Sequence, residues 1–126
     1  TVKSFFFFFL ESRKLRGMVV MNAEMYRACA ISVTDIESDD IRVVCAQAAD
    51  ELLSVSGVDA SFVIFKTDDI INISARSMGK VNVQLIMEAL GGGGHQTMAA
   101  VQLKDITESQ IKDMLKTAID NYYSNL

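Results

Sequence analysis

The 126-residue sequence contains no proline and no tryptophan, and it has one histidine and two cysteines. Without proline, a serine-rich stretch or an internal repeat, nothing in the composition marks a boundary between two folded domains. The length suits one compact domain, and half of the residues are hydrophobic, which is enough for a substantial core.

The scarcity of histidine and cysteine argues against a metal centre built by this chain. Zinc sites use clustered Cys and His ligands, whereas Cys29 and Cys45 are 16 residues apart and belong to no Cys-x-x-Cys pair. A catalytic metal for phosphate chemistry needs several converging Asp, Glu or His side chains, and we expect no such site here. Both cysteines lie in apolar patterns, so we expect buried free thiols and a reducing compartment.

Excess positive charge is also lacking, because 12 Lys and Arg residues face 16 Asp and Glu residues, for a net charge of −4. This balance provides no long-range attraction for a polyanion, so we do not expect an extensive nucleic-acid surface. A small phosphorylated ligand held by a few local donors remains compatible with the composition.

No apolar stretch reaches the length of about 20 residues that a membrane span needs, so we expect no membrane contact from this chain. The strongest apolar run is SFFFFFL at 4–10, which lacks the basic segment and cleavage site of a secretory signal. We expect a helix over 4–16 that ends at Gly17. Because Phe5 to Phe9 cannot share one helix face, we expect a buried interface such as a dimer contact, with a tag-like sequence as the alternative.

Hydrophobic periodicity predicts alternating strands and helices along the rest of the chain. The predicted strands are 27–34, the hairpin pair 61–66 and 70–76, and 99–103. The predicted helices are 41–55, between an Asp39–Asp40 cap and Gly57, and 83–90, capped by Asn82. A final helix begins with a Thr107–Gln110 capping box. The fold class is therefore α/β, with a mixed sheet of about four to five strands flanked by helices.

Four of the seven glycines form one run, Gly91 to Gly94, and the only histidine, His95, follows directly. Gly91 can end the preceding helix in the left-handed conformation, and Gly92 to Gly94 can adopt positive φ angles. Successive backbone N–H groups in such a bend form a concave anion site, which a helical turn starting near His95 would strengthen. We expect the imidazole to donate a hydrogen bond or a proton to the bound oxygen. A flexible linker is the alternative interpretation.

A second candidate site is SARSMGK, residues 74–80. Arg76 offers a planar fork of donors that matches phosphate or carboxylate, Ser77 adds a hydroxyl, and Lys80 adds a point charge. An exposed strand-end arginine and a solvated lysine are the structural alternatives. The P-loop pattern GxxxxGK[ST] fails at both ends. Neither this segment nor the glycine segment contains an aromatic residue on which the bases of a nucleic-acid strand could stack.

The glycine segment GGGGHQTMAA resembles the Gly-Gly-Gly-His…Ala-Ala signature of the DHH-associated domain, which is the C-terminal half of DHH phosphoesterases. A related module occurs in alanyl-tRNA synthetases. The longer stretch ISARSMGKVNVQLIMEALGGGGHQTMAA, residues 73–100, is similar to the end of the membrane-anchored, GdpP-like cyclic di-AMP phosphodiesterases of Gram-positive bacteria. The resemblance runs from about Asn22 to Tyr123, whereas the phenylalanine run departs from the polar connecting helix that the family leads us to expect.

The resemblance implies a DHH-associated substrate-binding domain over residues 18–126, with residues 1–17 forming a connecting helix from an upstream DHH domain outside this sequence. In the family, that upstream domain supplies Asp and His ligands for two manganese ions, so no cofactor is expected in this chain itself. The residues that the resemblance assigns to the substrate phosphate are Gly92, Gly93, Gly94 and His95, with His95 as the catalytic residue, and those assigned to the nucleotide are Arg76 and Ser77.

Three hypotheses follow for function. The first is the substrate-binding domain of a manganese-dependent phosphodiesterase that hydrolyses cyclic di-AMP to pApA. Under this hypothesis the chain is inactive alone and lies in the cytoplasm, and an upstream segment anchors the parent protein to the cell membrane. The second is the same domain from an oligoribonuclease or single-strand exonuclease of the superfamily, which binds a short oligonucleotide. The third is a homodimerisation module without a ligand, which the phenylalanine run motivates.

Overall fold

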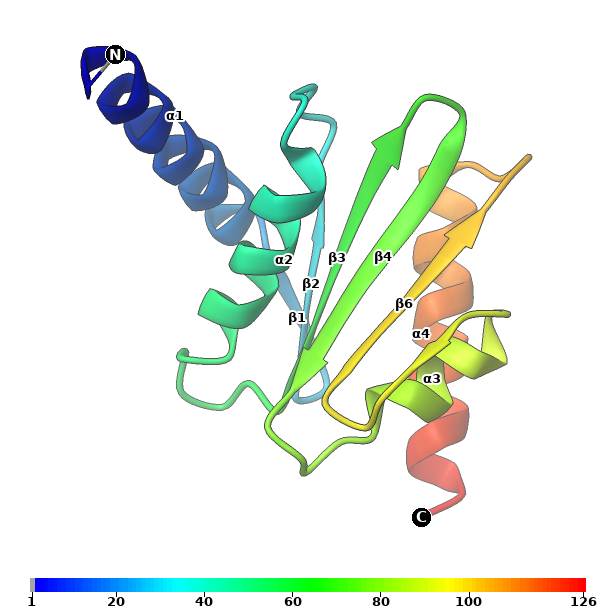
Figure 1. The fold of residues 1–126 in the computed structure, drawn as a ribbon. Coiled ribbons are helices and arrows are strands. Elements are labelled where there is room, and N and C mark those ends of the chain that lie inside the picture. Colours follow the sequence, from blue (N-terminus) through cyan, green and yellow to red (C-terminus); the bar gives the residue numbers. More distant parts are fainter. Residues whose placement is uncertain (1) are drawn as a thin grey trace.

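The computed structural model describes residues 2–126, which form a six-stranded sheet with helices on both faces (Figure 1). The elements are α1 (Val2–Met21), β1 (Glu24–Tyr26), β2 (Cys29–Val33), α2 (Ile41–Leu52), β3 (Ala60–Thr67), β4 (Ile70–Ser77), α3 (Val83–Ala89), β5 (Gly93–Gly94), β6 (Met98–Leu103) and α4 (Glu108–Ser124). The α/β class with a mixed sheet is confirmed. The expected count of four to five strands was too low, because β1 and β5 have only three and two residues and show no readable alternation.

The strands lie in the order β1-β2-β3-β4-β6-β5. β2 and β3 run parallel, and the other neighbouring pairs are antiparallel. The predicted β3–β4 hairpin is confirmed, and its turn includes Asp68 with a φ of 53°. Because β6 runs back beside β4, the end of β4 at Ser77 and the start of β6 at Met98 meet at one end of the sheet.

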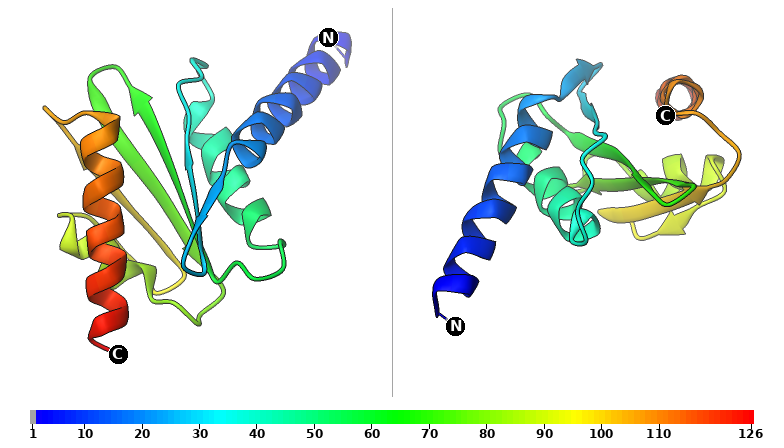
Figure 2. Two further views of the ribbon diagram at one scale, coloured as in Figure 1. Left: turned by 180° about the vertical axis from the view of Figure 1, so that it is seen from behind. Right: turned by 90° about the horizontal axis from the view of Figure 1, so that it is seen from above.

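Two hydrophobic cores lie on the two faces of the sheet. Helices α3 and α4 cover one face, and α1 and α2 cover part of the other (Figure 2). Successive residues of β3 alternate between the cores, with Phe62 and Ile64 on the α3–α4 side and Val63 and Phe65 on the α1–α2 side. This alternation explains why the four central residues of β3, 62–65, are all apolar, as the sequence predicted for a strand covered on both faces.

The predicted starts of α3 and α4 are confirmed by their caps. The side chain of Asn82 accepts hydrogen bonds from the N–H groups of Gln84 and Leu85. Thr107 and Gln110 form both reciprocal bonds of a capping box. Each cap satisfies N–H groups that have no partner within the helix, so these two helices begin where the sequence places them.

The ends of α1 and α2 differ from the prediction. α2 follows Asp40 as expected, but the Asp40 side chain makes no cap hydrogen bond within the described chain, and the helix ends at Leu52 rather than at residue 55. α1 continues through Gly17 to Met21, so Gly17 does not end it. A glycine inside a helix costs only about 1 kcal/mol relative to alanine, and the complete burial of Val19 in the following turn outweighs that cost.

The N-terminal half of α1 projects beyond the rest of the molecule (Figures 1 and 2). The side chains of Phe5 to Phe9 are between 48% and 74% exposed. Five successive residues at 100° per step surround the whole helix, so a phenyl ring faces every direction. Among the described residues, no helix is both long and apolar enough to cross a membrane.

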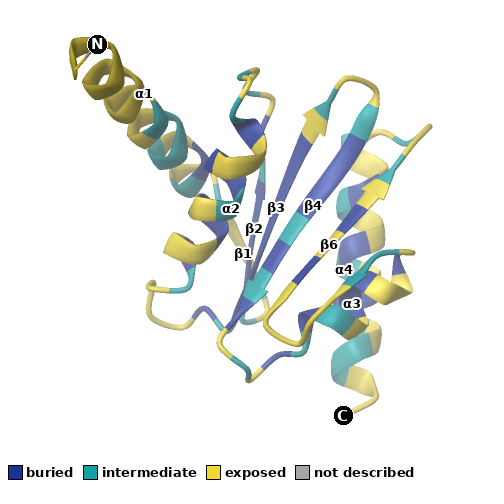
Figure 3. Cartoon of the chain, viewed as in Figure 1, coloured by how far each residue is buried: buried dark blue, intermediate teal, exposed yellow. Residues whose placement is uncertain are grey.

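The helices leave one part of the sheet uncovered. α2 packs on β3 and β4, and the same side of β6 is exposed at every second residue (Figure 3). The intervening residues Ala99 and Val101 are buried in the α3–α4 core. We call the α2-side surface of β4 and β6 the open face, which consists of Ser74 and Arg76, partly covered by α2, and the exposed residues Met98, Ala100 and Gln102.

Candidate ligand-binding site

The glycine run begins as the C-terminal end of α3. Gly91 has a φ of 91°, so the prediction that it ends the helix in the left-handed region is confirmed. The N–H groups of Gly91 and Gly92 donate to the carbonyl oxygens of Glu88 and Met87, at 3.0 and 2.8 Å. These bonds satisfy carbonyl groups at the end of α3 that have no partner within the helix. Two amides of the run are therefore used by the helix itself.

The next two glycines, Gly93–Gly94, form β5, which pairs with β6 at the edge of the sheet. A Cβ on Gly92 would lie 2.2 Å from the carbonyl oxygen of Ala100, and a Cβ on Gly94 would lie 2.5 Å from the backbone of β6. A Cβ on Gly93 would meet no described atom within 4 Å. The run is therefore a packed bend and a short strand, and the alternative of a flexible linker does not fit this arrangement.

The expected cup of successive amide hydrogens is not formed. His95 N–H donates to the Met98 carbonyl at 2.6 Å and its own carbonyl accepts from Met98 N–H at 3.3 Å, so a hairpin, rather than a helical turn, follows the run. Of the three glycines expected at positive φ, only Gly94 is there, at 144°. Because bonded and non-bonded pairs alternate along antiparallel strands, the Gly94 amide points away from β6, toward the sheet edge. One outward amide remains for an anion.

Arg76, Met98 and His95 lie in one row across the end of the sheet. Arg76 pairs with Met98 in the register of β4 and β6, and Met98 pairs with His95 across the hairpin. Directly opposed residues project from the same side of a sheet, so the His95 side chain projects on the same side as the open face. Two strand spacings separate the backbones of Arg76 and His95 by about 10 Å.

The guanidinium of Arg76 is held by α2. Its Nε lies 3.3 Å from Oδ1 of Asp50, and the Arg76 side chain is only 13% exposed. Nη1 donates to the carbonyl oxygen of Ala75 at 2.9 Å. The buried Nε has no hydrogen-bond partner among residues 2–126, because its N–H is not aligned with the nearby carboxylate. The ion pair is therefore close in distance but incomplete in geometry.

Ser77 and Lys80 lie in the connection between β4 and α3. Ser77 is buried, and its hydroxyl donates to the Val81 carbonyl at 2.6 Å, so it closes this loop on itself. Contact of Ser77 with a nucleotide stays a prediction, and the structure shows the hydroxyl engaged within the protein. Lys80 has a side chain that is 79% exposed, and its Nζ lies 3.5 Å from Asp59. A solvated lysine with a weak ion pair describes it well.

Sequence reasoning missed two members of this region. Asp50 lies on α2, 26 positions before Arg76, and no local pattern connects a helix residue to one strand residue over that distance. Met98 precedes the predicted strand 99–103 by one residue. Its 51% exposed side chain continues the alternation of β6, so extending the strand backward by one position could have found it.

The two cysteines are confirmed as buried free thiols. Burial raises the pKa of Cys29 to about 11, although contact with the Tyr123 hydroxyl opposes the shift. Burial alone raises the pKa of Cys45 to about 12. A nucleophilic cysteine reacts as the thiolate, so neither thiol is suited to covalent catalysis near neutral pH.

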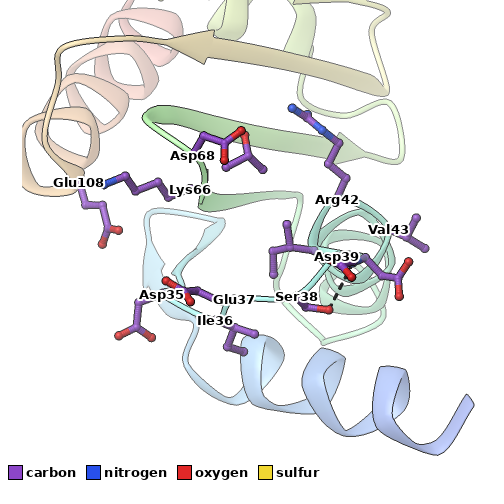
Figure 4. Close-up of a pocket in the computed structure, with 13 residues that line it drawn as sticks. Asp35, Ile36, Glu37, Ser38, Asp39, Arg42, Val43, Lys66, Asp68 and Glu108 are labelled. Atoms are coloured by element: carbon purple, nitrogen blue, oxygen red, sulfur yellow. Dashed lines mark hydrogen bonds between the residues drawn. The ribbon is translucent and has the colours of Figure 1, made fainter. Parts of the chain in front are cut away.

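A large hollow lies at the opposite end of the sheet, away from the row of Arg76 and His95 (Figure 4). It has a volume of about 1010 Å³, and carboxylates outnumber the cations that line it, Arg42 and Lys66. The acidic residues are Asp35, Glu37, Asp39, Asp40, Asp68 and Glu108. Such a lining repels anions. Within the described chain, no group of three or more His, Cys, Asp or Glu residues is placed to hold a metal ion.

The structure is a small α/β domain that carries Arg76, His95 and one outward backbone amide at one end of its sheet. Comparison with protein families shows which family the chain belongs to. The DHHA1 domain model matches residues 14–124, so the chain belongs to this family. The match begins after the phenylalanine run.

The chain is similar to curated cyclic-di-AMP phosphodiesterases. It is 48% identical over 110 residues to PdeA of Listeria monocytogenes, covering 86% of this chain and 17% of that protein. It is 57% identical over 83 residues to GdpP of Bacillus subtilis, covering 65% of this chain and 13% of that protein. The chain therefore spans less than a fifth of the length of these relatives. The family recognised from the sequence is confirmed.

Among solved structures, the fold is similar to that of an exopolyphosphatase-related protein from Bacteroides fragilis, with a TM-score of 0.73. The sequence identity is 23%, and the match covers 88% of this chain and 34% of that one. At this identity the likeness supports the fold alone.

Proposed function

We propose that this chain is the substrate-binding domain of a DHH-family phosphodiesterase that hydrolyses cyclic di-AMP to pApA. The observation that carries the proposal is the row of Arg76, Met98 and His95 on the open face, beside the outward amide of Gly94. The similarity to cyclic-di-AMP phosphodiesterases of Listeria and Bacillus supports the choice of ligand.

Within this site, each residue has a distinct role toward a phosphoryl group. Arg76 presents the positive charge of its guanidinium and the Nη2 donor to the phosphoryl oxygens. His95 donates a hydrogen bond to an oxygen on which negative charge increases during the reaction, and the Gly94 amide adds a fixed donor. Gly93 carries no side chain, so the ligand can approach the backbone closely. Roles for Gly92 and Ser77 would be indirect, through the packing of the bend and the loop.

This chain supplies hydrogen-bond donors for a phosphate but no metal site for hydrolysis among its described residues. Its described residues do not fit a manganese site, because no three acidic, His or Cys side chains converge. We therefore place the two manganese ions in an upstream DHH domain of the same protein, where they would activate water and stabilise the leaving oxygen. In this arrangement residues 1–17 connect the two domains, residues 18–126 cover the substrate, and the chain alone is inactive and cytoplasmic.

Ligand titration tests the proposal. The chain, alone and combined with a separately produced DHH domain, is titrated with cyclic di-AMP and with linear pApA. Arg76→Ala and His95→Ala should each weaken binding at least tenfold, because each removes a charge-assisted or positioned donor. Arg42→Ala is the matched control, since Arg42 is an exposed arginine at the acidic end of the sheet. Unchanged affinity in both site variants would refute the assignment.

A competition experiment separates the substrate classes. If the parent enzyme is an oligoribonuclease or single-strand exonuclease, a short RNA should displace cyclic di-AMP at lower concentration than the dinucleotide displaces the RNA. We expect the reverse, because Met98 is the only large apolar side chain of the open face and no aromatic residue offers a stacking surface on that face.

The exposed phenylalanine run favours a second role, which is self-association through α1. Each of Phe5 to Phe9 is at least 48% exposed, and together they surround the helix. A homodimer that buries this segment is compatible with a phosphate site on the open face, because the run and the open face lie in different parts of the molecule (Figure 1).

A further inference from the structure

Resting on the proposed function, we propose that Asp50 is a positioning residue that sets the direction of the Arg76 guanidinium and thereby the affinity of the open face for phosphate. Within the described chain, no hydrogen bond or ion pair joins the Asp50 side chain to another member of the site row, so it would act through Arg76 alone. The Nε to Oδ1 separation of 3.3 Å is the contact through which it acts.

The turn of α2 that carries Asp50 is fixed over Arg76. Ser61 is the direct partner of Arg76 in the β3–β4 register. Its buried hydroxyl donates to the carbonyl oxygen of Ala49 at 2.6 Å, which ties the residue before Asp50 to the sheet. The carboxylate therefore reaches Arg76 from an anchored backbone, although the Asp50 side chain itself is 63% exposed.

Two sides of the guanidinium are occupied by the protein. Nε faces Asp50, and Nη1 donates to the carbonyl oxygen of Ala75. No hydrogen bond joins the remaining nitrogen, Nη2, to the described part of the chain. Asp50 and Ala75 thus contact two different edges of the planar group, and Nη2 keeps an N–H for a ligand. Nε itself is buried, and the Asp50 carboxylate lies 3.3 Å from it, so the turn of α2 shields its N–H from water even without a ligand.

A positioning role for Asp50 predicts that removing its carboxylate weakens anion binding, whereas simple electrostatics predicts that it strengthens anion binding. Removing a carboxylate near an anion site should strengthen anion binding if the charge acts only through space or competes with the ligand. If Asp50 positions Arg76, Asp50→Asn should weaken binding, because the guanidinium spends less time in the competent orientation. We expect the affinity for cyclic di-AMP to fall roughly fivefold, which corresponds to one orientation in five being competent.

The control is Glu51→Gln. Glu51 is the next residue of α2, it is also partly exposed, and its carboxylate pairs with Arg16 at 3.4 Å on the α1 side. The same unit of charge is removed one residue away, so this variant should bind at least as tightly as the unaltered chain. In an Arg76→Ala background, Asp50→Asn should have no further effect, because the coupling between the two residues is lost.

A ligand-free measurement keeps the inference separate from the proposed function. In the NMR spectrum, the Nε–H signal of Arg76, identified by its loss in Arg76→Lys, should exchange slowly with water and should exchange at least tenfold faster in Asp50→Asn. If the unaltered chain binds neither cyclic di-AMP nor pApA, the proposed function fails while this signal still tests the positioning. Unchanged exchange, or unchanged or tighter binding in Asp50→Asn, would overturn the role of Asp50.

Discussion

The packing of the glycine bend makes a sharp prediction for two neighbouring glycines. In Gly92→Ala, the new methyl group would lie 2.2 Å from the carbonyl oxygen of Ala100 and 2.6 Å from Cβ of Val101. Ordinary contacts lie near 3.5 Å, so β6 or the bend must move by about 1 Å. The first obstacle is backbone, which cannot rotate away as a flexible side chain can. In Gly93→Ala, the methyl group meets no described atom within 4 Å.

The energetic difference follows from these distances. Forcing a methyl group into a packed site costs about 1–3 kcal/mol, and more when backbone must shift, so we expect a loss of about 3 kcal/mol for Gly92→Ala. For a domain of this size, that corresponds to a decrease of roughly 10 °C in Tm. Gly93→Ala should lie within about 0.5 kcal/mol of the unaltered chain, or gain up to about 1 kcal/mol from the smaller entropy of the unfolded chain.

Urea unfolding followed by circular dichroism measures both variants. The midpoint concentration should fall in Gly92→Ala and stay nearly constant in Gly93→Ala, while the slope m stays the same in both. Equal midpoints for the two variants would refute the reasoning, because the chemistry of the change is identical and only the surroundings differ.

The structure supports three further predictions. Asn82→Ala should lower the free energy of unfolding by about 1 kcal/mol in a urea titration, and Asn82→Gly by a smaller amount, because glycine is tolerated at a helix N-cap; equal losses would contradict the cap. Burial raises the pKa of Cys45 from 9.0 to about 12, so the unfolded chain loses the thiol proton first and stability should fall as pH rises above 9; the fall should be shallower in Cys45→Ala, and parallel curves would count against it. Replacing Phe6 and Phe8 by serine should dissociate an oligomer in sedimentation experiments, and an unaltered chain that is monomeric throughout would exclude self-association through α1.

The long periodic elements could be predicted because their patterns report burial directly. β3 is apolar on both faces and is covered on both, and the caps at Asn82 and Thr107 depend only on residues within one helical turn. β1 and β5 could not be predicted, since three and two residues are too few to show a period. Gly17 misled the prediction because burial of the following turn outweighs the low helix propensity of one glycine.

The candidate site could be predicted only in part, for a similar reason. Arg76 and His95 are visible because each sits in a short segment of unusual composition. Their alignment through Met98 depends on the β4–β6 register, and the partner Asp50 comes from a helix 26 residues earlier. The prediction of a cup formed by successive backbone N–H groups was wrong, because the local sequence does not show which carbonyl groups lie close enough to accept from them. The Gly92 N–H donates to the carbonyl oxygen of Met87 in α3, and the His95 N–H donates to the carbonyl oxygen of Met98.

The four glycines of the run are therefore required for different structural reasons, or for none. Gly91 is required by its φ of 91°, whereas Gly92 and Gly94 are required by the closeness of β6 on the core side. Gly93 has neither constraint: its φ is not positive, and a Cβ there would point into open space among the described residues. Folding explains the other three without any ligand, so the presence of a run is not by itself evidence for a phosphate site. Gly93 is the position at which an added methyl group would obstruct a ligand while leaving the fold intact.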